Sequence, residues 1–270
     1  MIDPTSSESS SKREPIGEAL PVEIIGHRGA SFDAPENTLA SVCLAWKHGA
    51  NAVEIDVHLS KDGRILVSHD PTTLRLGKVN LAIAENDAET LRQVDVGSWK
   101  SLEFQDERLP FLEEVLATIP LGKRLLIEVK SGPASVAALK KALQASGRLD
   151  REAAILSFDP DVVALSKQLM PKRKAYWVVE LRPERLAGLD PPNVAELLAK
   201  AHEIQADGLD LSACAAITPD FGLTVRQSGL ELIVWTVNTE EVARRMIAAG
   251  VQGLTTDRPG WLRERLENEG

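Results

Sequence analysis

The feature that most constrains the fold of this 270-residue chain is a repeated alternation of short β-type runs with longer helical patterns. The runs that read as strands are 22–26, 52–59, 124–129, 153–158, 174–180, 207–211, 231–237 and 253–256. Each is followed by a segment with apolar residues at helical spacing. Eight such units predict an α/β fold, the closed (β/α)8 TIM barrel of about 250 residues. A doubly wound open sheet is the alternative, but no Gly-x-Gly-x-x-Gly motif follows the first strand.

The second unit departs from this alternation, because two strand-like runs are joined by a short turn. Segment 52–59 leads through Ser60–Gly63, which has turn chemistry, into the run 64–68. So short a connection predicts an antiparallel hairpin, in which residue numbers summing to about 123 face each other. That register would place His69 roughly opposite Glu54. The weakly periodic stretch that follows, about 70–109, is predicted to be a small insertion that covers the site.

The rest of the chain bounds its organisation and partners. Residues 1–19 are polar and Ser-rich and predict a disordered tail, which leaves 20–270 as a single barrel domain. The net charge of -9 and the lack of a basic stripe argue against a nucleic-acid partner. No apolar run is long enough for a membrane anchor, and no signal-peptide core is present, so a cytoplasmic protein is expected. The sequence does not predict an oligomeric state.

Carboxylates gather where the predicted strands end, and that edge of a barrel is where active sites lie. Glu54 and Asp56 are two apart on one strand and so share a face, and Glu128 ends the next strand of the barrel. Burying like charges together is costly, and a hard cation such as Mg²⁺ or Ca²⁺ would explain the cluster. The alternative is a salt-bridge network of the carboxylates with Arg28 and Lys130.

Histidines occur at two of the same strand ends. His27 and His69 would suit general acid and general base work beside a bound anion near neutral pH. Arg28 and Lys130 supply positive charge for phosphoryl oxygens. His58 shares the face of Asp56 but lies further along the hairpin, and we expect it on the hairpin surface.

The tetrapeptide Pro35–Thr38 opens the first predicted helix. Asn37 or Thr38 can cap that helix, and Pro35 fixes the turn before it. An alternative role for Glu36 or Asn37 is to steer the loop around His27. The sequence leaves both interpretations open.

Six segments, taken together, resemble the glycerophosphodiester phosphodiesterase family, whose members have barrels like that of phosphatidylinositol-specific phospholipase C. The segments are HRGASFDAPENT (27–38), EIDVHLSKDG (54–63), VSHDPT (67–72), IEVK (127–130), WTVN (235–238) and GVQGLTTDRP (250–259). They follow the order of the family and span nearly the whole chain after the tail. One of them alone would be a weak signal, but six in order are a specific one.

The resemblance implies a barrel enzyme with one divalent metal ion, Mg²⁺ or Ca²⁺. Its substrate would be a small glycerophosphodiester, hydrolysed to sn-glycerol 3-phosphate and an alcohol. The implied roles are metal ligation by Glu54, Asp56 and Glu128, acid–base catalysis by His27 and His69, and substrate binding by Arg28, Lys130 and Trp235. The family usually continues Arg-Thr-Thr after the second histidine, whereas here Arg75 is followed by Leu76 and Gly77, in the stretch expected to cover the site.

Two other functions compete with this one. A lysophospholipase D-type enzyme or another lipid phosphodiesterase would need an apolar rim. Apolar residues of the covering stretch could form that rim or be the insertion's own core: Leu74, Leu76, Val79, Leu81 and Ile83. A non-catalytic binding barrel would have lost a histidine or a carboxylate, and none is missing here.

Overall fold

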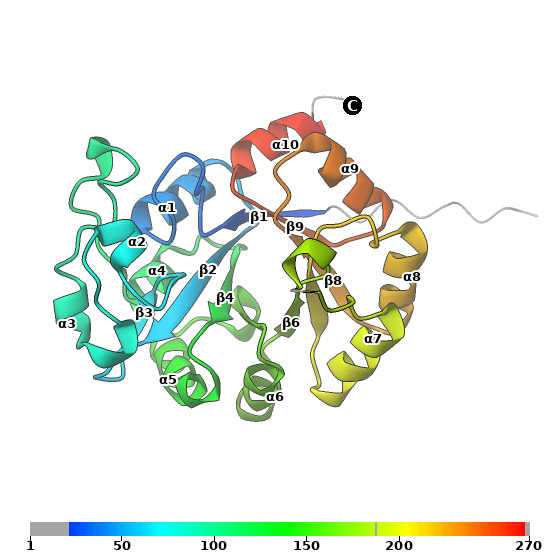
Figure 1. Ribbon diagram of the computed structural model, residues 1–270, viewed down its shortest axis with the longest axis horizontal. Helices are drawn as coiled ribbons and strands as arrows, with labels where there is room; N and C mark the ends of the chain where they lie inside the picture. Colours follow the sequence, from blue (N-terminus) through cyan, green and yellow to red (C-terminus); the bar gives the residue numbers. More distant parts are fainter. Residues whose placement is uncertain (1–21, 187, 268–270) are drawn as a thin grey trace, which may run out of the picture.

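The computed structural model describes residues 22–186 and 188–267, and its centre is a closed barrel of eight parallel strands (Figure 1). The barrel closes because β1 pairs with both β2 and β9, which excludes the open sheet. The strands are β1 (Glu23–His27), β2 (Ala52–Leu59), β4 (Arg124–Val129), β5 (Ala153–Ser157), β6 (Ala175–Val179), β7 (Gly208–Ser212), β8 (Glu231–Trp235) and β9 (Gly253–Thr256). The predicted TIM barrel is confirmed. The predicted tail, 1–19, lies outside the described residues, and the domain limits stay a prediction.

Helices surround the barrel and separate consecutive strands (Figure 1). They are α1 (Leu39–Lys47), α4 (Leu112–Thr118), α5 (Val136–Ala145), α6 (Pro160–Leu169), α7 (Val194–Glu203), α8 (Pro219–Gln227), α9 (Glu240–Ala248) and α10 (Pro259–Glu267). The main apolar core lies between these helices and the outer face of the barrel. Observed and predicted strand bounds agree to within two residues, the largest difference being β8, which ends at Trp235 rather than at residue 237.

The two faces of β2 show how the barrel positions the site. Val53, Ile55 and Val57 belong to the core under the helices. Ala52 belongs to the small apolar cluster inside the barrel. Because side chains alternate along a strand, Glu54 shares the inner face with Ala52 and projects into the barrel. The apolar residues therefore fix the direction of the acidic ones.

The predicted hairpin is present, since β3 (Ile65–Val67) pairs antiparallel with β2, but its register differs by one residue. Val57 faces Val67, so the numbers sum to 124, because the turn 60–64 closes symmetrically through a Ser60 N–H to Arg64 O bond. The ladder then ends, and His69 is not the ladder partner of Glu54. The chain bends after β3, and His69 still reaches the cavity that Glu54 lines.

The insertion after β3 contains the short helices α2 (Leu74–Gly77) and α3 (Ala88–Leu91) and lies on the outer side of the hairpin (Figure 1). It has an apolar core of its own, formed by Leu66, Leu76, Ile83, Ala88, Leu91, Val94, Val96 and Leu109. Leu81 packs against this core, whereas Leu74 and Val79 are exposed. Most of its apolar side chains therefore stabilise the insertion itself. In the described part of the chain, no helix has the length and apolar character needed to cross a membrane.

Candidate active site

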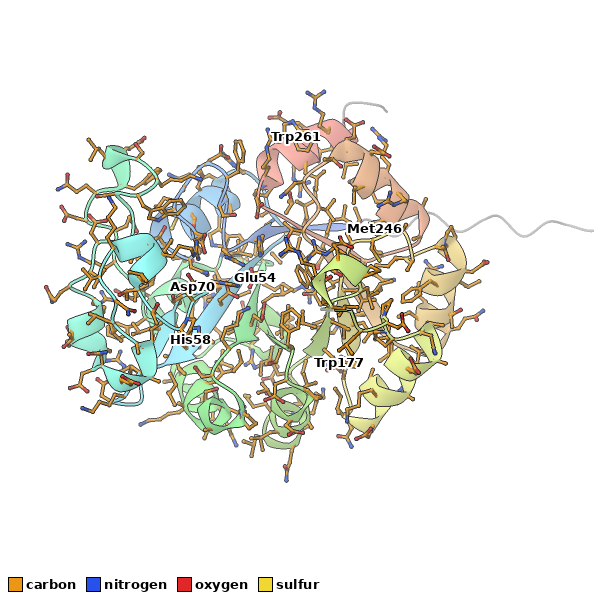
Figure 2. All side chains as sticks on the ribbon, viewed as in Figure 1. Glu54, His58, Asp70, Trp177, Met246 and Trp261 are labelled. Carbon is orange, nitrogen blue, oxygen red and sulfur yellow. The ribbon has the colours of Figure 1, made fainter. Side chains whose placement is uncertain are left out.

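A cavity of about 100 Å³ opens at the carboxyl ends of the strands, and seven of the eight predicted site residues line it. They are His27, Arg28, Glu54, His69, Glu128, Lys130 and Trp235. The eighth, Asp56, is buried beside the cavity against Lys130. Figure 2 shows Glu54 toward the middle of the barrel, with Trp261 and Met246 out among the helices. Phe158, Asp210 and Thr255 also line the cavity and were not predicted.

Three carboxylates form a compact group in this cavity. One ligand oxygen from each of Glu54, Asp56 and Glu128 lies within 4.8 Å of the others. Burial, together with the charges of Asp56 and Glu128, raises the pKa of Glu54 well above its usual range. Burial and the charge of Asp56 raise the pKa of Glu128 to about 7. The group is therefore electrostatically unfavourable by itself.

Two cations partly compensate these carboxylates. Lys130 Nζ lies 3.0 Å from Asp56 Oδ1 and also contacts Glu128, and Arg28 Nε lies 3.2 Å from Asp56 Oδ2. Burial opposes ionisation of Asp56, but Lys130 and Arg28 lower its pKa to about 2.

The salt-bridge network considered as an alternative is thus present, but it does not neutralise the three carboxylates or give all of their oxygens a partner. Glu54 Oε1 is buried and has no hydrogen-bond partner. Three carboxylates against two cations leave one negative charge when all are ionised. Oxygen ligands with excess negative charge fit a hard divalent cation such as Mg²⁺ or Ca²⁺.

The loop after β1 explains why this site needs the sequence His-Arg-Gly. Arg28 has a φ of 53° and Gly29 a φ of 87°. In this conformation the Arg28 N–H donates to Glu54 Oε2 over 3.0 Å. A Cβ on Gly29 would lie 2.4 Å from the Ser41 carbonyl carbon, so only glycine fits. Uncommon backbone geometry here serves to hold Glu54.

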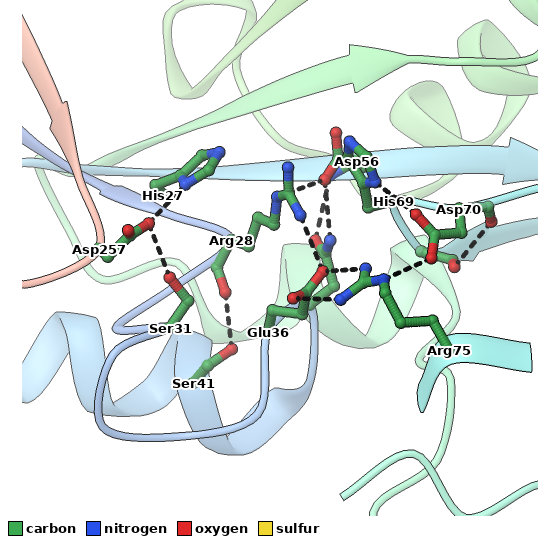
Figure 3. A network of polar contacts seen from close by, with 12 residues as sticks. His27, Arg28, Ser31, Glu36, Ser41, Asp56, His69, Asp70, Arg75 and Asp257 are labelled. Atoms are coloured by element: carbon green, nitrogen blue, oxygen red, sulfur yellow. Dashed lines mark hydrogen bonds and ion pairs between the residues drawn. The ribbon is translucent and has the colours of Figure 1, made fainter. Parts of the chain in front are cut away.

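Both roles considered for the tetrapeptide Pro35–Thr38, helix capping and support of the site, are present in the structure. Thr38 caps α1, because its hydroxyl accepts from the Ser41 N–H. Asn37 instead holds Asp56: its Nδ2 donates to Asp56 Oδ2 over 2.9 Å, and its Oδ1 accepts from the Asp56 N–H. Glu36 accepts from Arg28 Nη1 over 2.8 Å (Figure 3). This segment therefore caps the helix and also positions two groups of the site.

His27 is held by a carboxylate that directly follows the last strand of the barrel. Its Nδ1 lies 2.6 Å from Asp257 Oδ1, and Asp257 also accepts from Ser31 Oγ (Figure 3). A further hydrogen bond to Asp257 comes from Asn238 Nδ2. Burial opposes ionisation of Asp257, but the hydrogen bond and charge of His27 lower its pKa to about 2. Sequence reasoning gave Asp257 no role, although its place at the end of a strand was a usable signal.

His69 has a matching arrangement on the hairpin side. Its Nδ1 lies 2.7 Å from Asp70 Oδ1, and Arg75 pairs with both Asp70 and Glu36 (Figure 3). Arg75 therefore ties the insertion to the site. His58 is only 8% exposed, so the expectation of a surface residue was wrong, because the inner face of β2 continues past Asp56. Its Nε2 donates to His69 O over 3.1 Å and so supports the backbone of that residue.

Two aromatic rings also line the cavity. Phe158 and Trp235 meet edge to face with ring centroids 5.7 Å apart. Lys130 Nζ lies 5.6 Å from the Phe158 centroid. Trp235 lines the cavity, and its role in substrate binding stays a prediction, whereas Phe158, directly after β5, was missed.

The barrel carries an acidic cluster and two histidine–aspartate pairs at its carboxyl mouth, which is where barrel enzymes have their active sites. Residues 27–261 match the model of the glycerophosphoryl diester phosphodiesterase family, and the chain belongs to that family. The expected enzyme class, a phosphoric diester hydrolase, is confirmed.

Individual relatives match over most of their length. The chain is 34% identical over 243 residues to YhdW of Bacillus subtilis, which covers 88% of this chain and 96% of that one. It is 31% identical over 241 residues to the glycerophosphodiester phosphodiesterase of Caldanaerobacter subterraneus, which covers 87% and 94%. Its structure is similar to that of an Oleispira antarctica phosphodiesterase in complex with the product sn-glycerol-3-phosphate. That match has a TM-score of 0.80 and 28% identity and covers 92% and 97% of the two chains.

Proposed function

We propose that this protein hydrolyses small glycerophosphodiesters to sn-glycerol 3-phosphate and an alcohol, using one divalent metal ion and two histidines. The observation that carries the proposal is the buried group of Glu54, Asp56 and Glu128, which retains an unpartnered oxygen in the cavity that His27 and His69 line. The product bound to the Oleispira phosphodiesterase supports this class of substrate.

Glu54, Asp56 and Glu128 would hold the ion, Mg²⁺ or Ca²⁺. When bound there, it would polarise the phosphoryl oxygens and offset the charge that develops on them. Arg28 and Lys130 line the same cavity and bind the remaining phosphoryl oxygens.

The histidines carry the proton transfers. Because Asp257 and Asp70 occupy the Nδ1 atoms of His27 and His69, each ring keeps Nε2 for exchange with the substrate. One imidazole accepts the proton of the attacking hydroxyl, which is water or the substrate's own glycerol hydroxyl. The other donates a proton to the leaving alcohol as its bond to phosphorus breaks. Attack by the glycerol hydroxyl forms a cyclic phosphate, which water then opens to sn-glycerol 3-phosphate. The aspartates fix the ring orientation and stabilise the charged imidazolium.

The lipid alternative is less well supported. Leu76 and Ile83 belong to the core of the insertion rather than to a rim around the site. Leu74 and Val79 are exposed, but neither lines the active-site cavity. A small polar substrate therefore fits the entrance better than a long acyl chain.

The test is release of sn-glycerol 3-phosphate from glycerophosphocholine by chelator-stripped protein, before and after addition of Mg²⁺ or Ca²⁺. We expect release only with metal, and we expect Glu54→Gln to abolish it. Glu203→Gln, which changes an exposed glutamate on α7, is the matched control and should retain the wild-type rate. Equal release with and without metal would refute the metal role, and no release with either metal would refute the proposed substrate class.

A further inference from the structure

Two buried polar groups in the active-site cavity take no part in the mechanism above. Asp210, on β7, is 3% exposed, and its Oδ1 has no hydrogen-bond partner. Thr255, on β9, is 2% exposed, and its Oγ1 also has none. Both line the same cavity as Trp235, which lies on β8 between them. Leaving a buried polar group unpaired costs about 1–3 kcal/mol, so two such groups aimed into one cavity indicate a ligand.

Asp210 is held in place by its backbone alone. Trp235 Nε1 donates to the Asp210 main-chain oxygen over 3.3 Å, and the strand pairing of β7 with β8 fixes the rest of the residue. The carboxyl group therefore faces the cavity without a partner from the protein. It is also separate from the proposed metal ligands, because the compact group within the described residues contains Glu54, Asp56 and Glu128 but not Asp210.

The chemistry of these two groups suits hydroxyls. Burial, with a smaller contribution from the charge of Glu128, raises the pKa of Asp210 well above its usual range. A neutral carboxyl group both donates and accepts a hydrogen bond, as does the hydroxyl of Thr255. Neither group attracts an anion as a lysine would, so the uncharged part of the substrate is the natural occupant of this wall.

The neighbouring residues of the cavity indicate which part of the substrate that is. The same cavity is lined by the proposed metal ligands Glu54 and Glu128 and by Arg28 and Lys130, so a group beside Asp210 and Thr255 lies next to the phosphoryl group. A second cavity shares His27 and Arg28 with it and includes Phe32 and Lys100. The glyceryl group carries free hydroxyls that can pair with Asp210 and Thr255, and the second cavity can take the variable alcohol.

We propose that Asp210 and Thr255 form a subsite that binds the free hydroxyls of the glyceryl group. This inference rests on the proposed function, and it assigns selectivity for glycerol to residues that neither hold the metal nor transfer the protons. A hydrogen bond to each hydroxyl contributes about 0.5–1.5 kcal/mol, so the pair should favour a glyceryl over a propyl group by about tenfold or more.

The test compares two ligands that differ only in those hydroxyls. Calorimetry on Mg²⁺-loaded protein would measure binding of sn-glycerol 3-phosphate and of n-propyl phosphate. We expect the wild type to prefer sn-glycerol 3-phosphate by about tenfold or more. Asp210→Ala should reduce this preference to within about twofold and leave propyl phosphate binding unchanged. Asp210→Asn, which keeps a donor and an acceptor, should restore most of it.

Thr255→Val, which removes only the hydroxyl, should lower the preference partially. Asp220→Ala, an exposed aspartate on α8, is the matched control and should not change it. An undiminished preference in Asp210→Ala would overturn the subsite, and so would an equal loss of both ligands or of Mg²⁺ affinity. Binding does not depend on turnover, so a wild type that binds selectively but releases no product would contradict the proposed function and leave the subsite standing.

Discussion

The charged groups at the two ends of the barrel differ in whether they have partners. At the amino-terminal end, Arg124 pairs with Glu23 and donates to the Tyr176 hydroxyl over 3.1 Å. That hydroxyl donates to Glu231, which also pairs with Lys174. Among the described residues, no buried atom of these five side chains lacks a partner. This end forms a closed network, as expected where a barrel face serves stability.

At the carboxyl-terminal end, some buried polar atoms have no hydrogen-bond partner. Glu54, Asp210 and Thr255 each keep a buried polar atom without a partner. Burial and like charge raise the pKa values of Glu54 and Glu128. The comparison teaches that unpartnered polar groups indicate a ligand where they gather in one cavity, since isolated ones such as Ser166 Oγ and Arg173 Nε also occur away from it.

The largest expected effect is on catalysis. His27→Ala and His69→Ala should each lower kcat for glycerophosphocholine by on the order of 10²-fold or more, because each removes a proton-transfer group. Both variants should keep the wild-type unfolding temperature and metal affinity. His202→Ala, which changes an exposed histidine on α7, is the control. Rates close to wild type in both active-site variants would refute the mechanism.

At the amino-terminal end of the barrel, a substitution should lower stability and leave catalysis nearly unchanged. Arg124→Ala should lower the free energy of unfolding by about 1–3 kcal/mol, because it strips Glu23 and Tyr176 of a charged partner. Its kcat should stay within about twofold of wild type, since the residue lies at the opposite end of the strands. Chemical denaturation and the glycerophosphocholine assay measure both quantities. A large loss of kcat without a loss of stability would invalidate the contrast between the ends.

The two ends should also differ in their response to pH. In metal-free protein the folded pKa of Glu128, about 7, exceeds its ordinary value of 4.5, so folding binds a proton between these limits. Stability at the mouth is therefore lost as pH rises from 4.5 to about 7. Burial opposes ionisation of Glu231, but Lys174 and Tyr176 lower its pKa, so its contribution is lost as pH falls below 4.5.

Unfolding temperatures of chelator-stripped protein across this range measure that difference. Glu128→Gln should flatten the decline between pH 4.5 and about 7, whereas Glu231→Gln should alter only the acid side. Identical profiles for wild type and Glu128→Gln would show that the mouth does not carry the expected electrostatic cost.

The smallest effect is expected from substitutions in the insertion after β3. Leu74→Ser and Val79→Ser change exposed side chains, so stability should shift by less than about 0.5 kcal/mol. The rate with glycerophosphocholine should not change, because neither side chain lines the cavity. Assays with a lysophospholipid test the alternative directly. Loss of lysophospholipid turnover in these variants would reinstate a lipid-binding rim.

Sequence reasoning succeeded where a local pattern dictates the result. Periodicity gave the strands and helices, and alternation along β2 put Glu54 and Asp56 on the inner face. Sequence reasoning failed where the position of a residue depends on the geometry of a turn or on a partner from a distant strand. The hairpin register depended on the centre of a five-residue turn, and β2 buried His58 by continuing past Asp56.

The residues that sequence reasoning missed were missed for one physical reason. Asp257 becomes the partner of His27 only when the first and last strands of the barrel pair. Asp210 sits in the ordinary strand pattern GLDLS, and its lack of a partner depends on which side chains the other strands bring to the cavity. Barrel closure is a long-range property that neither segment encodes by itself.

The most direct test of the central claim is a calorimetric titration of chelator-stripped protein with Mg²⁺ and with Ca²⁺. If the mouth is arranged around a cation, the wild type will bind one ion with a rise in unfolding temperature, and Glu54→Gln and Glu128→Gln will lose both effects while Glu231→Gln keeps them. No binding of either ion by the wild type, or equal binding by all three variants, would contradict the account and leave the mouth as a salt-bridge network of Arg28 and Lys130 with the carboxylates.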